Sequence, residues 1–328
     1  MRGRSFLSFF ILGVLLIGGG SLLHAQIPVA EGLAVSLYPA YPRPYQTVTV
    51  VPESTLIDLA TANVTVSVNG SVVSEGSGAE PAYVTIGGPG TATTVVVRAT
   101  AGGQAYSKTL TIRPADVSLI IESRSTSHPF YQGGSLVASE GGVRIVAIPD
   151  IRTANGAVVP SSNLVYTWRS GDQVLQASSG IGKSVLSASA PVRYRDARLT
   201  VTVSTQDRSI VAETSTTIAP ADPMVRLYRS DPLLGPWYQT ALPETLELAG
   251  DEETFRAVPY HFSAPPAIAW TLNGDPADTG SDITVRAAGS EAGTAVLTAS
   301  AKSPLSQDTT DSVRITFGAP GILSIFGL

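Results

Sequence analysis

Two histidines set narrow limits on the chemistry that this chain can perform. Apart from His24 near the N-terminus, the sequence holds only His128 and His261, each next to a proline-rich, aromatic stretch. Neither has a second metal ligand at the short spacing that zinc sites use. No Gly-x-Ser-x-Gly turn occurs that would expose a serine nucleophile. We therefore expect both histidines to be ordinary loop or surface residues, in a protein that is not an enzyme and needs no cofactor.

Cysteine is absent from the whole chain. This rules out a thiol nucleophile, a zinc–thiolate site and the disulfide that braces many immunoglobulin domains. It also rules out a lipoprotein whose lipid is attached to cysteine.

Acidic residues gather in two short segments. Asp275, Asp278 and Asp282 lie close together, and carboxylate oxygens are the ligands that calcium prefers. Their spacing differs from that of an EF-hand loop, and turns also require Asp, Gly and Pro. We interpret residues 275–282 as a solvated turn, with calcium binding left open, and residues 251–253 as an exposed hairpin tip.

An aromatic side chain follows proline at three places, each time just before a glutamine. The occurrences are Pro44-Tyr45-Gln46, Pro129-Phe130-Tyr131-Gln132 and Pro236-Trp237-Tyr238-Gln239. At exposed loop tips such rings could bind a glycan, a peptide or another subunit. Because the pattern recurs, we favour the alternative that each ring packs over the open end of its own β-sandwich. The candidates for partner binding are Tyr45, Tyr131, Trp237 and Tyr238.

A longer repeat organises the chain around these residues. Three β-branched runs end in proline, and each is followed by a second strand-like run that closes at a glycine. The prolines are Pro52, Pro149 and Pro259, and the glycines are Gly70, Gly171 and Gly274. The glycines lie roughly 100 residues apart, which is the size of one immunoglobulin-like sandwich. The repeat predicts domains at 26–114, 115–220 and 221–318.

The predicted domains consist of short strands joined by proline-stiffened links. Residues 64–68 alternate valine with polar side chains before Asn69-Gly70, a strong hairpin signal. No window beyond the N-terminal segment has sustained helical periodicity. The links at 112–116 and 218–222 share the pattern Ile-x-Pro-Ala-Asp. Such links predict a semi-rigid rod rather than beads on a flexible string.

Trp168 and Trp270 stand on alternating runs shortly before the turn glycines, where domain one has Val66. A tryptophan on the third strand of an immunoglobulin-like sandwich packs at the centre of the core. Residues 166–171, Tyr-Thr-Trp-Arg-Ser-Gly, resemble that strand in PKD-type and other bacterial immunoglobulin-like repeats, without the acidic Gly-Asp-Gly turn of the fuller pattern. Residues 227–241 look like an element of uncharacterised secreted immunoglobulin-like proteins from bacteria. The resemblance implies three tandem immunoglobulin-like sandwiches in an all-β chain and implies no activity.

Composition and charge fit this class of protein. Charged residues make up 14% of the chain, the net charge is −5, and glycine and proline are frequent. A mildly acidic chain with very few lysines is not expected to bind nucleic acid or an anionic membrane surface.

Both ends of the chain are apolar. Residues 1–25 combine two arginines, an apolar stretch and Ala25, which predicts a signal peptide cleaved after Ala25, with an uncleaved membrane anchor as the alternative. Residues 319–328 carry no charge and are too short to span a bilayer. Their apolar side chains are further candidates for partner binding, as an alternative to packing on domain three: Ile322, Leu323, Ile325, Phe326 and Leu328.

These observations predict a secreted or envelope-associated structural and interaction protein that spaces and binds protein partners in a surface complex. The alternative is a carbohydrate-binding or enzyme-accessory protein that uses aromatic loop tips on a glycan. We expect membrane contact only through an uncleaved signal segment or through residues 319–328.

Overall fold

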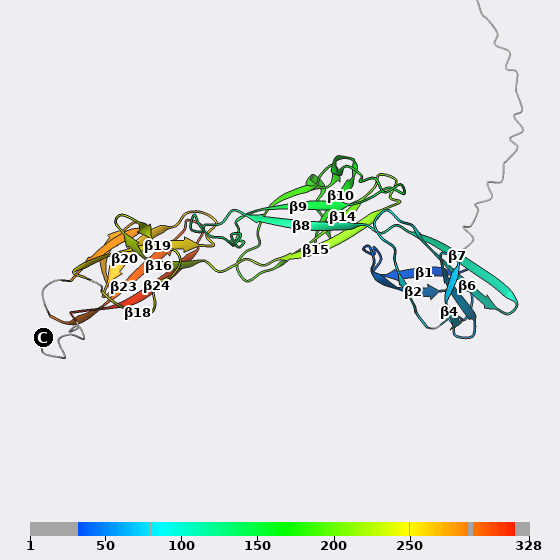
Figure 1. Cartoon of the computed structure of the whole chain (residues 1–328), viewed down its shortest axis with the longest axis horizontal. Coiled ribbons are helices and arrows are strands. Elements are labelled where there is room, and N and C mark those ends of the chain that lie inside the picture. Colours follow the sequence, from blue (N-terminus) through cyan, green and yellow to red (C-terminus); the bar gives the residue numbers. More distant parts are fainter. Residues whose placement is uncertain (1–31, 79, 249, 288–290, 319–328) are drawn as a thin grey trace, which may run out of the picture.

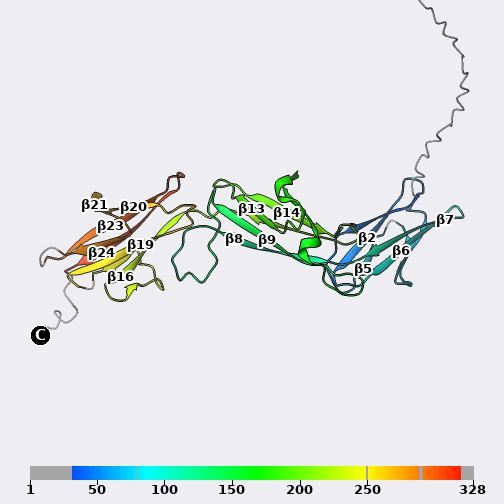
Figure 2. The same ribbon diagram turned by 90° about the horizontal axis from the view of Figure 1, so that it is seen from above.

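The computed structural model describes residues 32–78, 80–248, 250–287 and 291–318. Over these residues the chain is all-β and forms tandem immunoglobulin-like sandwiches, which follow one another along one long axis (Figures 1 and 2). The predicted signal segment, 1–25, and the apolar tail, 319–328, lie outside the described residues. The described part contains no helix with the length and hydropathy needed to cross a membrane.

Module one is a sandwich of a three-stranded sheet, β1-β2-β5, and a four-stranded sheet, β4-β3-β6-β7. Its strands are β1 (Ala34–Tyr38), β2 (Thr47–Glu53), β3 (Asn63–Val68), β4 (Ser71–Ser77), β5 (Ala82–Thr85), β6 (Thr93–Ala101) and β7 (Gln104–Ile112). Side chains on a strand alternate between its two faces. In β6 this alternation places Val95, Val97 and Ala99 in the core with no exposed surface.

Module two has the same two-layer arrangement, with sheets β13-β9-β8 and β11-β10-β14-β15, and β12 pairs with β10. Its strands are β8 (Asp116–Ser123), β9 (Gly142–Asp150), β10 (Val165–Ser170), β11 (Gln173–Val174), β12 (Gly180–Ile181), β13 (Val185–Ser189), β14 (Ala197–Ser204) and β15 (Val211–Ile218). Two single 3-10 turns, Ser161–Asn163 and Gln176–Ser178, flank β10 and β11.

Module three pairs the sheet β17-β16-β19-β22 with the sheet β18-β24-β23-β20-β21. Its strands are β16 (Met224–Asp231), β17 (Gly235–Pro236), β18 (Thr245–Glu247), β19 (Glu252–Tyr260), β20 (Ala267–Leu272), β21 (Asp275–Thr279), β22 (Asp282–Arg286), β23 (Gly293–Lys302) and β24 (Asp308–Phe317). Each module encloses its own cluster of buried apolar side chains. The domain boundaries predicted from the sequence stay predictions.

The three prolines of the sequence repeat occupy equivalent places in the fold. Each lies near the end of a strand that is paired with the first strand of its module, opposite a valine: Val35 with Pro52, Val117 with Pro149, and Val225 with Pro259. In each case the third strand of the sheet ends before it reaches the proline. The missing N–H therefore faces no neighbouring strand, which is where a sheet tolerates proline.

The two tryptophans occupy equivalent core positions, as the sequence predicts. Trp168 on β10 and Trp270 on β20 are 0% and 1% exposed. Each indole Nε1–H donates a hydrogen bond to a backbone oxygen, of Lys183 at 2.9 Å and of Gly280 at 2.8 Å. Val66 on β3 fills the corresponding place in module one and is also buried.

Two hairpins share one turn geometry, and the sequence predicted a hairpin at the first of them, Asn69-Gly70. Asn69 and Gly70 join β3 to β4 with φ angles of 50° and 89°, and Asn273 and Gly274 join β20 to β21 with 53° and 91°. Consecutive residues with positive φ favour Asn-Gly. The sequence did not predict the partner strands β4 and β21, nor β13 of module two. All three lie at sheet edges and are largely exposed, so they lack an alternating apolar pattern.

Candidate functional surfaces

A long connection of module two reaches across to module three. It runs from the end of β8 to the start of β9, and Thr126 within it bonds to two consecutive residues of module three. Its backbone N–H donates to the Phe262 oxygen at 3.0 Å, and its backbone oxygen accepts from the His261 N–H at 2.9 Å. Its hydroxyl oxygen accepts from the Phe262 N–H at 3.0 Å. One residue of module two therefore satisfies three backbone groups beside a fully buried Phe262.

An aromatic cluster continues this contact. The ring of His128, from the same connection, stacks on Tyr238 of module three with centroids 4.7 Å apart and planes 6° from parallel. Tyr131 meets Tyr260 of module three edge-on at 6.1 Å. The Tyr260 and Tyr228 hydroxyls are 2.8 Å apart, and burial together with this bond raises the pKa of Tyr260. Aromatic pairs in such geometries stabilise a contact beyond the area that they bury.

Tyr131 and Tyr238 therefore correct our sequence interpretation. We expected each aromatic motif to cover the open end of its own sandwich. In the structure, Tyr131 of module two and Tyr238 of module three contribute to one cluster that joins the two modules. The connection between β8 and β9 is longer than the loop between β1 and β2 in module one. This extra length was the signal in the sequence that could have indicated a contact beyond module two.

Polar groups complete the junction between modules two and three. Gln307 of module three is buried and donates from Nε2 to the Ser139 oxygen at 2.9 Å. Its Oε1 accepts from the N–H and the hydroxyl of Ser263 at 2.9 and 3.0 Å. The backbone N–H of Ala221 donates to the Val137 oxygen at 2.8 Å. Gln307 is therefore paired both across the junction, with Ser139, and within module three, with Ser263, as buried polar groups in stable interfaces are.

His261 lies in the loop between β19 and β20, in agreement with the loop position expected from the sequence, but it is buried. Its side chain is 5% exposed and its φ is 60°. Burial lowers the pKa of the imidazole, and its Nδ1 has no hydrogen-bond partner among the described residues. His261 is thus a neutral ring in the wall of the junction. His128 is half-buried and belongs to the same contact.

Polar side chains of Arg43, Asp116 and Thr214 connect modules one and two. Arg43 of module one pairs with Asp116 at 3.0 Å and donates to the Thr214 hydroxyl at 3.3 Å. An equivalent pair, Arg193 with Asp222 at 2.7 Å, stands at the next link. Each link aspartate is therefore held by an arginine of the preceding module.

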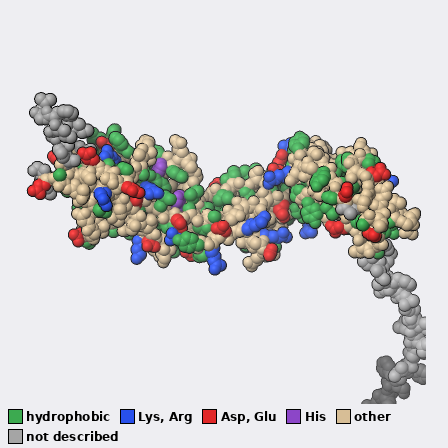
Figure 3. Space-filling model, turned by 90° about the horizontal axis from the view of Figure 1, so that it is seen from below, with side chains coloured by type: hydrophobic (Ala, Val, Ile, Leu, Met, Phe, Trp, Pro, Cys, Tyr) green, Lys and Arg blue, Asp and Glu red, His purple; other side chains and the backbone are tan. Residues whose placement is uncertain are grey.

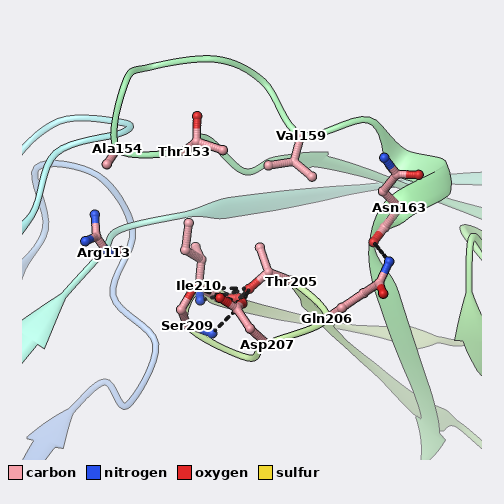
Figure 4. Close-up of a pocket in the computed structure, with 10 residues that line it drawn as sticks. All are labelled: Arg113, Thr153, Ala154, Val159, Asn163, Thr205, Gln206, Asp207, Ser209 and Ile210. Atoms are coloured by element: carbon pink, nitrogen blue, oxygen red, sulfur yellow. Dashed lines mark hydrogen bonds between the residues drawn. The ribbon is translucent and has the colours of Figure 1, made fainter.

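Figure 4 shows an open hollow of about 630 Å³ beside the first link. Its lining combines Arg113 of the link with two loops of module two, and Gln206 and Asp207 lie on one of them. The Asp207 carboxylate accepts bonds from Thr205 and Ser209 in its own loop, and these bonds lower its pKa. A carboxylate with a lowered pKa is a weak base for these hydroxyls, and no histidine is among the lining residues, so we assign no catalytic role to this hollow.

Trp237 borders a second hollow, of about 320 Å³, in module three. The tryptophan is 52% exposed, and Arg229, Asp231 and Glu253 line the same hollow. Arg229 pairs with Glu253 at 2.7 Å. Backbone N–H groups of the adjoining turn donate to Asp231 and lower the pKa of that carboxyl. An aromatic ring beside ionised, paired groups is suited to binding a polar ligand rather than to proton transfer.

Both acidic segments differ from our expectation. Residues 275–282 are not a simple turn, because β21 occupies 275–279 as an exposed edge strand. The segment 251–253 is not a hairpin tip either, since Glu252 begins β19 and pairs with Arg286 at 2.5 Å. A sequence pattern of acids cannot reveal these cross-strand partners. Across the described residues, no group of three or more His, Asp or Glu side chains could hold a metal ion.

The remaining candidate residues fall in two places. Tyr45 of module one is 72% exposed, and its hydroxyl lies against Gly88, where an added Cβ would stand 2.6 Å from it. The candidates of the C-terminal tail lie outside the described residues. Partner binding by any of these residues stays a prediction.

Comparisons with known proteins agree with the fold and do not extend it. No family model matches the sequence, and no curated protein matches it. The PKD-type resemblance therefore has no support at the level of a sequence family.

Solved structures of tandem modules are similar at low identity. The first is Sidekick-1 immunoglobulin domains 1–5, with 12% identity over 87% of this chain and a TM-score of 0.30. This chain covers 58% of the length of that protein fragment. The three N-terminal domains of the bacteriophage RB49 highly immunogenic outer capsid protein are 10% identical to this chain, with a TM-score of 0.27. That match covers 88% of this chain and 99% of the capsid protein fragment. Fibronectin(III)-like modules of Clostridium thermocellum CbhA are 14% identical to this chain, with a TM-score of 0.22. That match covers 62% of this chain and 97% of the CbhA fragment. We base no functional argument on these values.

Proposed function

We propose that this chain is a non-catalytic, exported structural and interaction protein, which holds its partners at a set spacing along an extended array of immunoglobulin-like modules. The observation that carries the proposal is the bonded junction of modules two and three. Thr126, the aromatic cluster and Gln307 connect the modules by buried hydrogen bonds and ring contacts. Modules linked only by a flexible connection would not need such contacts, since relative motion is the usual state of weakly joined domains.

The surface supports an interaction with protein partners rather than with nucleic acid. The face in Figure 3 shows acidic and basic side chains interspersed among a majority of uncharged groups. A nucleic-acid site requires a continuous basic stripe, and the chain is acidic as a whole. Export by residues 1–25 and partner binding by residues 319–328 are parts of this proposal that rest on the sequence alone.

Small-angle scattering in solution tests the proposed array. Strands of up to ten residues make each module about 34 Å long, and three modules in line come to roughly 100 Å. A thin rod of that length has a radius of gyration of roughly 30 Å, against about 20 Å for a compact globule of this size. We expect the larger value for residues 26–318. A value near 20 Å would contradict the proposal.

Glycan binding is the second candidate function. The observation in its favour is the half-exposed Trp237 ring beside the hollow that Arg229, Asp231 and Glu253 line. An exposed aromatic face combined with charged hydrogen-bonding groups fits a sugar residue as well as it fits a peptide. The variant Trp237→Ala is therefore included in the glycan experiment below.

A further inference from the structure

The outer face of the β1-β2-β5 sheet in module one presents a row of hydroxyl-bearing side chains. In the strand register, Tyr38 on β1 stands opposite Thr49 on β2, and Thr49 stands opposite Tyr83 on β5. Residues opposite each other on adjacent strands point to the same side of a sheet. The neighbours of this row, Val48, Val50 and Val84, are buried, so the row itself points outward.

Two tyrosine rings therefore project from one flat face. Tyr38 is 61% exposed and Tyr83 is 70% exposed. Because two strand spacings separate them, their attachment points lie about 10 Å apart. Large exposed aromatic rings on the open face of a sheet bury little area in the folded chain and are free to contact a ligand.

Hydroxyl groups continue the surface along the strands. The next outward row holds Thr47 and Thr85, whose Oγ1 atoms are 3.3 Å apart. One further step along the sheet, the Tyr45 N–H donates to the Gly87 oxygen at 3.1 Å, which places the exposed Tyr45 at the end of the same surface. Each hydroxyl can both donate and accept a hydrogen bond. We call Tyr38, Thr47, Thr49, Tyr83 and Thr85 the tyrosine face.

The corresponding faces of the other modules differ in charge. In module two, Arg144 on β9 pairs across the sheet with Glu122 on β8 at 2.7 Å. In module three, Arg256 on β19 makes a double hydrogen bond to Asp282 on β22, at 2.6 and 2.7 Å. None of the five side chains of the tyrosine face is charged. Module one therefore carries exposed rings and hydroxyls on this part of the sheet, and its exposed Glu53 lies at the far end of β2.

We propose that the tyrosine face binds an uncharged, extended, β-linked polysaccharide chain. The apolar faces of sugar rings can stack on the Tyr38 and Tyr83 rings, while the hydroxyls around each sugar bond to Thr47, Thr49 and Thr85. Neutral groups on both partners avoid the desolvation of unpaired charge. A flat face without walls suits a chain that lies along it, whereas small ligands bind in concave pockets. This site is separate from the spacing function and from the hollow at Trp237.

Calorimetric titration of the whole exported chain with cellohexaose and with chitohexaose tests the site, supported by retention on insoluble cellulose and chitin. We expect binding of at least one oligosaccharide by the unmodified chain. The double variant Tyr38→Ala/Tyr83→Ala should weaken it by about tenfold or more, because both stacking rings are lost. The double variant Tyr38→Phe/Tyr83→Phe keeps the rings and should keep most of the affinity. Circular dichroism confirms the fold of each variant, and the single alanine variants give a second reading if the double variant does not fold.

Tyr194→Ala is the matched control, since Tyr194 is 80% exposed on module two, where it lies under the Arg193 guanidinium. This variant should bind as the unmodified chain does. The proposal is overturned if neither oligosaccharide nor insoluble glycan is bound, or if Tyr194→Ala weakens binding as much as the double variant. It is also overturned if Trp237→Ala removes all binding while the double variant retains it. None of these outcomes bears on the scattering test of the array.

Discussion

Thr126→Val is the sharpest test of the junction between modules two and three. Valine keeps the branched shape of threonine and replaces the hydroxyl with a methyl group. The two backbone hydrogen bonds of residue 126 are retained, but the Phe262 N–H loses its acceptor. The change therefore removes one interaction of the junction and leaves its shape nearly unaltered.

The expected magnitude follows from the burial of this contact. Phe262 is 0% exposed, so water does not readily replace the lost acceptor. A buried donor without a partner costs about 1–3 kcal/mol. That range shifts the equilibrium between docked and undocked modules by roughly 5-fold to 150-fold. The variant Thr126→Ser keeps the hydroxyl and serves as the control, with a smaller loss from the missing methyl group.

Distance measurements between spin labels give the direct assay. Because the chain has no cysteine, the labels can be placed through Ser187→Cys on module two and Ala277→Cys on module three, which are both exposed. We expect one narrow distance distribution for the parent and for Thr126→Ser, and a broad one for Thr126→Val. If Thr126→Val gives the same narrow distribution and the same denaturation profile as the parent, the hydroxyl contact does not hold the junction and our reasoning is wrong.

Two further predictions concern module three. Trp270→Ala should lower the free energy of unfolding of module three by about 3–5 kcal/mol, because a fully buried side chain is removed. Urea denaturation measures the change, and a loss below about 1 kcal/mol would contradict the core position. Burial depresses the pKa of His261, so as the pH falls the imidazole is protonated in the unfolded chain before it is protonated in the folded chain. The free energy of unfolding should therefore fall as the pH drops below about 6.5, by at most about 1.4 kcal/mol for each pH unit. His261→Asn tolerates the positive φ and should flatten this dependence in thermal melts from pH 7.5 to 5, whereas an unchanged slope would rule out His261 as its source.

The sequence contains enough information to predict the fold class and most of the strands. Alternation of valine with polar residues marks β3, because one face of the strand packs into a core. The prolines recur roughly 100 residues apart, and the tryptophans of modules two and three do likewise, because equivalent modules place them at equivalent points of the fold. These signals are local or periodic, so they can be read without a structure.

The surfaces could not be predicted in the same way. Tyr131 and Tyr238 share a motif with Tyr45, yet both contact His128 in the cluster at a junction, whereas Tyr45 is exposed on module one. The tyrosine face depends on strand register, which aligns Tyr38 with Tyr83 across the intervening Thr49. Contacts between residues distant in sequence depend on which strands pair and on how the modules are placed, and no local pattern encodes either.

The two junctions show why a repeated link does not guarantee a repeated stiffness. Both links carry an aspartate paired with an arginine of the preceding module, Asp116 with Arg43 and Asp222 with Arg193. All four side chains are well exposed, and exposed pairs contribute about 0–1 kcal/mol each. These ion pairs orient the modules but cannot lock them. Among the described residues, the second junction adds a part-buried bond from Thr126 and a buried bond from Gln307, and no such bond is found at the first. If the array bends in solution, it should therefore bend between modules one and two, and modules two and three should move together as one unit.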